Sequence, residues 1–192
     1  MAGRDGSGDD RARRRDPRAG GHDGRPGVSA PRYVAVVGPS SSTAEQDETA
    51  ERLGAELASR GHVVVCGGGG GVMAAASRGA AGVGGLVVGL LPGLDRTEGN
   101  PHLTVAIPTG LGELRNGLVV RAADVVVAVG GSWGTLSEVA LAVRTGVPVV
   151  ALGFWRVPDE AAAGGRDGSP ALRRAADLDA ALLAVDRLLA DA

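Results

Sequence analysis

Lysine is absent from the 192 residues of this sequence, so all 20 basic side chains are arginines. This absence excludes a lysine Schiff base and the lysine of a phosphate-binding P-loop. Aromatic residues make up only 2% of the chain, namely Tyr33, Trp133, Phe154 and Trp155. Since 44% of the residues are hydrophobic, the core must consist of small aliphatic side chains, which suits a buried parallel sheet.

A second cysteine, a strong charge imbalance and a long apolar run are missing as well. Cys66 has no cysteine to pair with inside the chain, which fits a reducing compartment, and we expect a cytoplasmic protein. No apolar stretch near 18 residues is free of Gly, Pro and charge, so we expect no membrane span. The net charge is only −2, and the sequence after the first 30 residues is slightly acidic. This argues against nucleic acid as the main partner, because phosphate neutralisation needs a basic face.

The chain divides into a polar tail and one domain. Residues 1–30 are rich in Arg, Gly and Asp and hold almost no large apolar side chain, so we expect them to be disordered. From residue 31 to residue 192, short apolar runs alternate with segments of helical character, which predicts a single α/β domain with a Rossmann-like, doubly wound parallel sheet. The predicted strands are Tyr33–Val37, His62–Cys66, Leu86–Leu91, Leu103–Ile107, Val125–Val129 and Val147–Leu152.

Helix boundaries are indicated by capping residues and glycines. Ser42 with Glu45 three residues later forms a capping-box pattern for the first helix, which Gly61 ends. Residues 154–173 are rich in Gly, Pro and charge and are interpreted as a surface loop. The other predicted helices run from Gly71 to about Gly79, over Leu111–Ala123, from Gly134 to Arg144, and over Leu178–Leu189.

Three glycine-containing turns follow predicted strands, at the edge where open α/β sheets bind ligands. They begin at Gly38, at Gly67 (the first of five consecutive glycines) and at Gly130. Glycines before a helix let backbone N–H groups approach an anion closely, where the helix dipole also favours negative charge. We therefore predict a phosphate site formed by Gly38, Ser40, Gly68, Gly69, Gly70, Gly71, Gly131, Ser132, Gly134 and Thr135, with no metal ligands.

Several of these features also have a purely structural interpretation. The serines after Gly38 are typical helix caps, and Cys66 is more typical of a small buried side chain than of a reactive thiol. Glu138, one turn into a helix, is ordinarily a partner of the helix dipole. Arg115 lies at the head of a predicted helix, where the dipole disfavours a cation, and this favours a functional role.

The pattern Arg115…Asp124…Gly134-Thr135-x-x-Glu138, together with the earlier Gly-Gly-Gly-Val-Met turn, resembles the LOG branch of the SLOG superfamily. This branch includes proteins labelled lysine decarboxylase-like, and the resemblance covers about residues 32–153. It implies that Arg115 and Glu138 are catalytic residues of an enzyme cleaving the N-glycosidic bond of nucleoside 5′-monophosphates. It also implies that the glycine–threonine turn holds the phosphate and that the protein is a homodimer or homotetramer.

Three departures from the enzyme pattern make the sequence more similar to the molybdenum cofactor carrier-like subgroup. Asn116 replaces a lysine, Gly130 replaces a proline and Ser132 replaces a glycine. Two functions therefore remain open. The first is a binding protein for a small phosphorylated ligand, a nucleotide or the molybdenum cofactor, and the second is a phosphoribohydrolase using Arg115 and Glu138. The departures favour binding.

Overall fold

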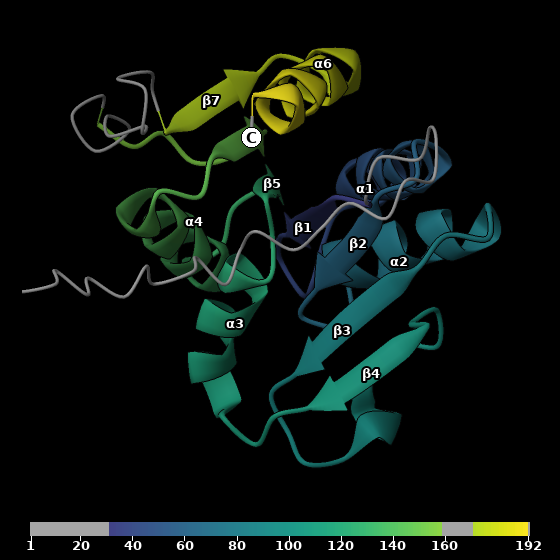
Figure 1. Ribbon diagram of the computed structural model, residues 1–192. Coiled ribbons are helices and arrows are strands. Elements are labelled where there is room, and N and C mark those ends of the chain that lie inside the picture. The colour runs from purple at the N-terminus through teal and green to yellow at the C-terminus, as the bar shows by residue number, and fades with distance from the viewer. Residues whose placement is uncertain (1–30, 159–170, 192) are drawn as a thin grey trace, which may run out of the picture. The chain divides into compact units, whose positions relative to one another are not determined.

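Runs of valine, alanine and leucine form a seven-stranded parallel sheet with the strand order β4-β3-β2-β1-β5-β6-β7 (Figure 1). The computed structural model describes residues 31–158 and 171–191, which belong to one compact unit, Pro31–Ala192. The strands are β1 Tyr33–Val37, β2 Val63–Cys66, β3 Val87–Leu91, β4 Val105–Pro108, β5 Val125–Val129, β6 Val149–Leu152 and β7 Leu172–Ala175. The α-helices are α1 Ala44–Ser59, α2 Val72–Gly82, α3 Asn116–Arg121, α4 Trp133–Thr145 and α6 Leu178–Ala190, with short 3₁₀ helices η1 Arg96–Glu98 and η2 Gly112–Arg115.

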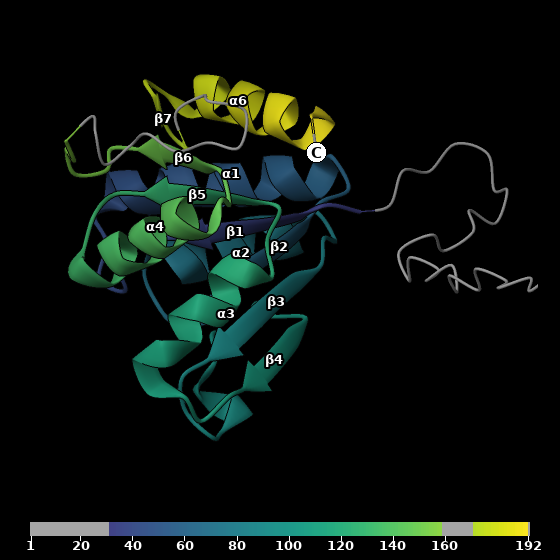
Figure 2. The same cartoon turned by 60° about the vertical axis from the view of Figure 1, so that its left-hand side comes forward.

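Helices cover both faces of the sheet, as the doubly wound interpretation predicts. Val34 and Val36 of β1 point into one core with α1, α2 and α6, whereas Ala35 and Val37 point into the other with α3 and α4 (Figures 1 and 2). This alternation follows from the two-residue repeat of a strand. The central strands are therefore buried on both sides, and the predicted α/β fold is confirmed.

The direction in which the chain adds strands reverses beside β1. From β1 the chain builds outward to β4, then returns through α3 to β5, which pairs with β1 in the register Val34↔Val125. The helices on the two sides of this point lie on opposite faces, so the connections diverge outside the carboxyl ends of β1 and β5, and we call this region the crevice. Such a switch point is where open α/β sheets bind their ligands.

The structure corrects three of the sequence predictions. The loop predicted for residues 154–173 runs into β7 at Leu172, an edge strand beside β6. The first helix is capped by Thr43 and Gln46 instead of Ser42 and Glu45: Thr43 Oγ1 accepts from the Gln46 amide and Gln46 Oε1 accepts from the Thr43 amide. The helix predicted for residues 111–123 is a 3₁₀ turn followed by the short α3.

Two further predictions concern other parts of the chain. The tail predicted for residues 1–30 lies outside the described residues. Among the helices of the described residues, none combines the length and the apolar character that crossing a membrane requires.

Candidate functional site

The three glycine turns meet at the carboxyl edge of the sheet. Gly71 has φ +58°, and a Cβ there would lie 2.3 Å from the Pro39 carbonyl oxygen, so the second turn touches the backbone of the first. The same carbonyl accepts a hydrogen bond from the amide of Val72, over 3.1 Å. A Cβ on Gly38 would lie 2.6 Å from the carbonyl oxygen of Val129, at the end of β5. The close approach that these glycines permit brings the ends of β1, β2 and β5 together.

The second turn is held from inside by Cys66. The buried Sγ of Cys66 accepts the amide of Gly68 over 3.3 Å and lies 3.6 Å from Ser77 Oγ. Burial raises the pKa of the Cys66 thiol above its usual value. This confirms the prediction of a buried side chain, because a reactive cysteine needs exposure and a lowered pKa. The amide of Gly68 is therefore already hydrogen-bonded within the turn. The next two glycines are more accessible, since Gly69 is half-buried and Gly70 is exposed.

The third turn leads into the N-terminus of α4. Ser132 caps the helix: its Oγ accepts the amide of Thr135 over 3.1 Å and lies 2.9 Å from the Thr135 hydroxyl oxygen. The first-turn amides left without a capping partner are those of Trp133 and Gly134, since Leu136 donates to the Ser132 carbonyl. A Cβ on Gly134 would meet only Ser132 Oγ, at 3.8 Å, so the space over this amide is open. The helix N-terminus therefore presents two free donors to an anion.

Two tryptophans border this turn on the side of β6. Trp133 and Trp155 meet edge to face, with ring centroids 5.2 Å apart. Gly131 lies directly under Trp155, where a Cβ would come within 2.6 Å of the indole ring. Trp133 is 78% exposed. Gly131 therefore packs against the indole ring of Trp155, which in turn contacts Trp133.

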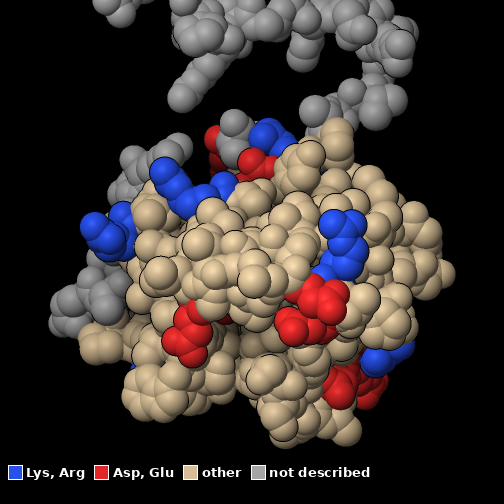
Figure 3. Space-filling model, turned by 90° about the horizontal axis from the view of Figure 1, so that it is seen from below, with Lys and Arg blue, Asp and Glu red and all other residues tan. Residues whose placement is uncertain are grey.

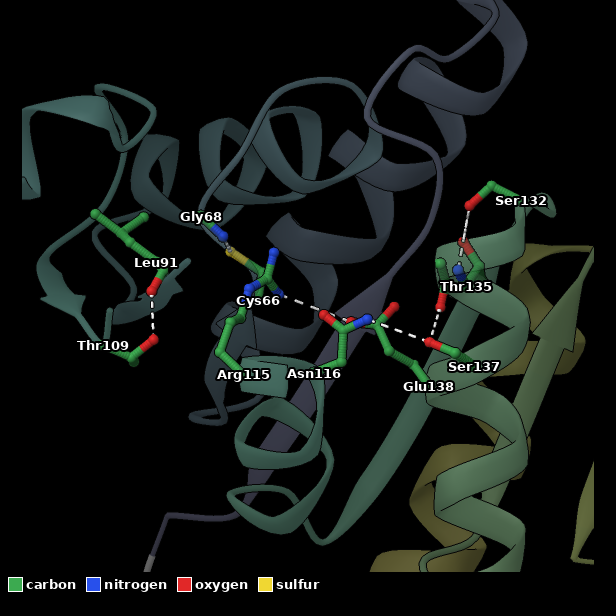
Figure 4. Close-up of polar contacts among 11 residues, drawn as sticks. Cys66, Gly68, Leu91, Thr109, Arg115, Asn116, Ser132, Thr135, Ser137 and Glu138 are labelled. Atoms are coloured by element: carbon green, nitrogen blue, oxygen red, sulfur yellow. Dashed lines mark hydrogen bonds and ion pairs between the residues drawn. The ribbon is translucent and has the colours of Figure 1, made fainter. Parts of the chain in front are cut away.

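Arg115 links the second turn to α4. It ends η2, and its side chain, only 12% exposed, lies against Gly67, where a Cβ would come within 2.2 Å of Arg115 Nη1. Figure 4 shows the guanidinium beside Cys66 and Gly68. Both Nε and Nη1 of this guanidinium are buried without a hydrogen-bond partner in the described part of the chain. Buried polar atoms are nearly always paired, so a buried arginine with two such donors marks a place for an acceptor.

Glu138 is the only acidic group that the structure pairs with this arginine among the described residues. Its Oε1 lies 3.8 Å from Arg115 Nη1, which is an ion pair but too long for a hydrogen bond. Burial raises the pKa of Glu138 to about 7, although the charge of Arg115 acts to lower it. Near neutral pH this carboxyl group is therefore present in both protonation states, as a general acid or base requires.

Asn116 and Asn100 were not assigned to the site from the sequence. Asn116 Nδ2 donates to Ser137 Oγ over 3.2 Å and ties the start of α3 to α4 beside Glu138 (Figure 4). Asn100, in the connection between β3 and β4, donates from its side chain to the carbonyl oxygens of Gly68 and Gly69. The sequence did not identify these contacts, although Asn116 occupies a position of the family pattern, because each asparagine forms them with residues distant in the chain.

The structure brings the predicted turns to the carboxyl edge of the sheet. Gly38 and Gly71 lie against the neighbouring turns, Arg115 lies against Gly67 and pairs with Glu138, and the residues from Gly131 to Thr135 lead into α4. Ser40 is exposed and directs its carbonyl oxygen towards Gly70 and Gly71. No group of three or more His, Cys, Asp or Glu side chains in the described part of the chain could hold a metal ion. The groups available for chemistry are the backbone donors, the guanidinium of Arg115 and the carboxyl group of Glu138, whose pKa is raised.

Comparison with known proteins adds the family context. The model of the SLOG cluster4 family matches residues 31–181. The molybdenum cofactor binding protein of Rippkaea orientalis superposes with a TM-score of 0.75 at 31% identity, covering 84% of this chain and 99% of its own. The molybdenum cofactor carrier protein of Chlamydomonas reinhardtii gives a TM-score of 0.72 at 35% identity, with the same coverage. An uncharacterised protein of Archaeoglobus fulgidus is 39% identical over 119 residues, which cover 62% of this chain and 78% of that protein.

Proposed function

Since the chain belongs to the SLOG cluster4 family, we propose that it binds a small phosphorylated ligand, the molybdenum cofactor or a nucleotide, in the crevice between β1 and β5. The two solved relatives are named for binding or carrying the molybdenum cofactor, which supports this class of ligand. In this proposal the cofactor is cargo, and the protein holds it without altering it.

The observation that carries the proposal is the buried guanidinium of Arg115. Its Nε and Nη1 have no hydrogen-bond partner among the residues that the structure describes, and its ion pair with Glu138 is 3.8 Å long. Leaving buried charged donors unsatisfied costs stability, and a phosphate oxygen would satisfy them with charge-assisted hydrogen bonds. The free amides of Trp133 and Gly134, at the positive end of the α4 dipole, offer further donors to the same anion.

The residues fit the phosphorylated end of either ligand. Arg115 and the amides at α4 would hold the phosphate, and the glycine turns leave the space for its approach. A bound molybdenum cofactor would supply its redox-active metal to an acceptor protein after release. What this chain contributes is binding, orientation and shielding of the phosphorylated end.

Isothermal titration calorimetry with AMP and ribose 5-phosphate tests the proposal, with adenosine as the unphosphorylated control. We expect the two phosphorylated probes to bind and adenosine to bind at least 10-fold more weakly, because charge-assisted hydrogen bonds contribute about 1.5–3 kcal/mol each. Arg115→Met keeps the bulk of the side chain and removes its donors, so it should weaken both phosphorylated probes and leave adenosine unchanged. Equal affinity for AMP and adenosine would refute a phosphate site.

A second candidate function rests on Glu138. Cleavage of an N-glycosidic bond builds positive charge on the ribose, which a buried carboxylate can stabilise. The Glu138 carboxyl, with its pKa raised to about 7 and Arg115 beside it, has the position and the titration range for this role. Incubation with AMP separates the functions: release of adenine and ribose 5-phosphate by the wild type, abolished in Glu138→Gln, would establish the hydrolase. Intact AMP recovered from a saturated complex would support the binding protein.

We also propose that the protein self-associates through an apolar surface beside the site. Val105 and Ile107 of β4 lie in register with Val88 and Leu90, so they point to the sheet face that α3 and α4 cover elsewhere, yet both are more than 40% exposed. We call this surface the β4 face, and it comprises Leu94, Val105, Ile107, Leu111, Leu114 and Leu118. Figure 3, which views the molecule from below the orientation of Figure 1, shows a mainly uncharged surface with acidic and basic groups at several places on it. Exposed large apolar side chains are typical of an interface where they gather on one surface.

A further inference from the structure

Asn100 joins the connection between β3 and β4 to the five-glycine turn. Its side-chain Nδ2 donates to the carbonyl oxygen of Gly68 over 3.3 Å, to that of Gly69 over 3.2 Å and to Ser77 Oγ over 3.4 Å. Its backbone amide donates to the Gly68 carbonyl over 2.8 Å, and its Oδ1 accepts the amide of His102 over 3.1 Å. One side chain thus holds two successive carbonyl groups of the turn.

Holding these carbonyls also decides where the next amides point. In a trans peptide the C=O and the following N–H point in opposite directions, and the described residues contain no cis peptide bond. With the carbonyls of Gly68 and Gly69 directed at Asn100, the N–H groups of Gly69 and Gly70 point away from it. Within the described residues no hydrogen bond engages these two amides, whereas the amide of Gly68 is bound to Cys66 Sγ.

The amides of these two adjacent glycines are therefore left as donors that an anion can engage. A second, independent feature of the same turn points to an anion: the guanidinium of Arg115 lies against Gly67 with its Nε and Nη1 buried and unpartnered. The turn therefore supplies donors from both the backbone and the arginine packed on it.

We propose that Asn100 is a positioning residue for ligand binding, which holds the five-glycine turn in the conformation that presents the amides of Gly69 and Gly70 to the phosphorylated ligand. The inference rests on the proposed function and adds a second donor group to the site at α4. A five-glycine segment has many accessible conformations, and a fixed partner for its carbonyls selects one of them. Asn100 acts through the turn and does not itself contact the ligand.

The test compares three variants by calorimetry with ribose 5-phosphate and AMP. Asn100→Ala removes the donor, and Asn100→Asp keeps the shape and the acceptor for His102 but places an oxygen against both carbonyls. Asp95→Ala is the matched control, because Asp95 caps η1 in the same connection through the Thr97 amide and does not contact the turn. We expect both Asn100 variants to lose about 10-fold or more in affinity for each probe, and Asp95→Ala to bind like the wild type.

NMR of the protein labelled with ¹⁵N-glycine distinguishes a positioning role of Asn100 from a general effect on folding. The measurement is the change in glycine amide chemical shifts when ligand is added. Ribose 5-phosphate should shift the amide resonances of Gly69, Gly70 and Gly134 in the wild type. In Asn100→Ala, the Gly134 shift should remain and the shift of Gly70 should be lost, because only the side chain holds the Gly69 carbonyl that sets the direction of this amide.

Wild-type affinity and wild-type shifts in both folded Asn100 variants would overturn the role of Asn100 while the proposed function stands. If neither probe binds the wild-type protein, the proposed function itself fails, and this inference fails with it.

Discussion

At the scale of single residues, we expect Arg115 to lower the free energy of unfolding of the protein without ligand. A buried guanidinium with two unpartnered donors destabilises the fold, and the Glu138 carboxyl, with its pKa raised to about 7, compensates it only in part. We expect Arg115→Met to raise the free energy of unfolding by about 1–3 kcal/mol at pH 6 while it weakens phosphate binding. Urea denaturation of both proteins without ligand measures the change. A destabilised Arg115→Met variant would show that the arginine has a structural partner.

Glu138 predicts a pH dependence of stability at the same scale. Its pKa is raised from 4.5 to about 7, so between these values the folded state binds more protons than the unfolded state. The stability of the wild type, relative to Glu138→Gln, is therefore highest below about pH 4.5 and falls as the pH rises to about 7. The total change is on the order of 3 kcal/mol. Urea denaturation of both proteins from pH 5 to pH 8 measures the difference, and a constant difference across this range would contradict the shift.

At the scale of elements, the N-terminus of α4 predicts the effect of a side chain at Gly134. A Cβ there meets open space, so Gly134→Val should fold, but its branched side chain would stand over the free amides at the start of the helix. We expect Gly134→Val to lose AMP and ribose 5-phosphate binding by at least 10-fold, with its melting temperature within a few degrees of wild type. Calorimetry and thermal melting measure the two effects. Unchanged binding would remove α4 from the site.

The same scale shows what the sequence could and could not predict. The buried strands were recognisable because their apolar runs are continuous, whereas β7, with the sequence Leu-Arg-Arg-Ala, carries charges as edge strands often do. Two overlapping capping patterns, one starting at Ser42 and one at Thr43, cannot be distinguished without the backbone path.

Some residues of the candidate site could likewise be predicted from the sequence and others could not. Arg115 and Glu138 could be proposed because they belong to a spaced motif, although their roles stay predictions. Asn100 could not, since its contact with the glycine turn bridges more than 30 positions of the chain.

At the scale of the whole molecule, the β4 face predicts self-association. We expect the wild type to be at least a dimer in sedimentation velocity at micromolar concentration, and Ile107→Glu to be a monomer because it places a charge within the apolar contact. Leu183→Glu is the control, since Leu183 is also exposed, at 51% against 42% for Ile107, and lies on α6, outside the β4 face. A monomeric wild type, or equal effects of the two substitutions, would reject this face as the interface.

The contact between Trp133 and Trp155 has a consequence for observing the protein in solution. These are the chain's two tryptophans, and they meet at one point beside Gly131. The intrinsic fluorescence of the native protein therefore comes almost entirely from the border of the crevice, and Trp133, at 78% exposure, should emit at long wavelength. A change in tryptophan emission of the folded protein therefore reports a change in the surroundings of Trp133 and Trp155. Ligand binding at the proposed site can then be followed without attaching a fluorescent label.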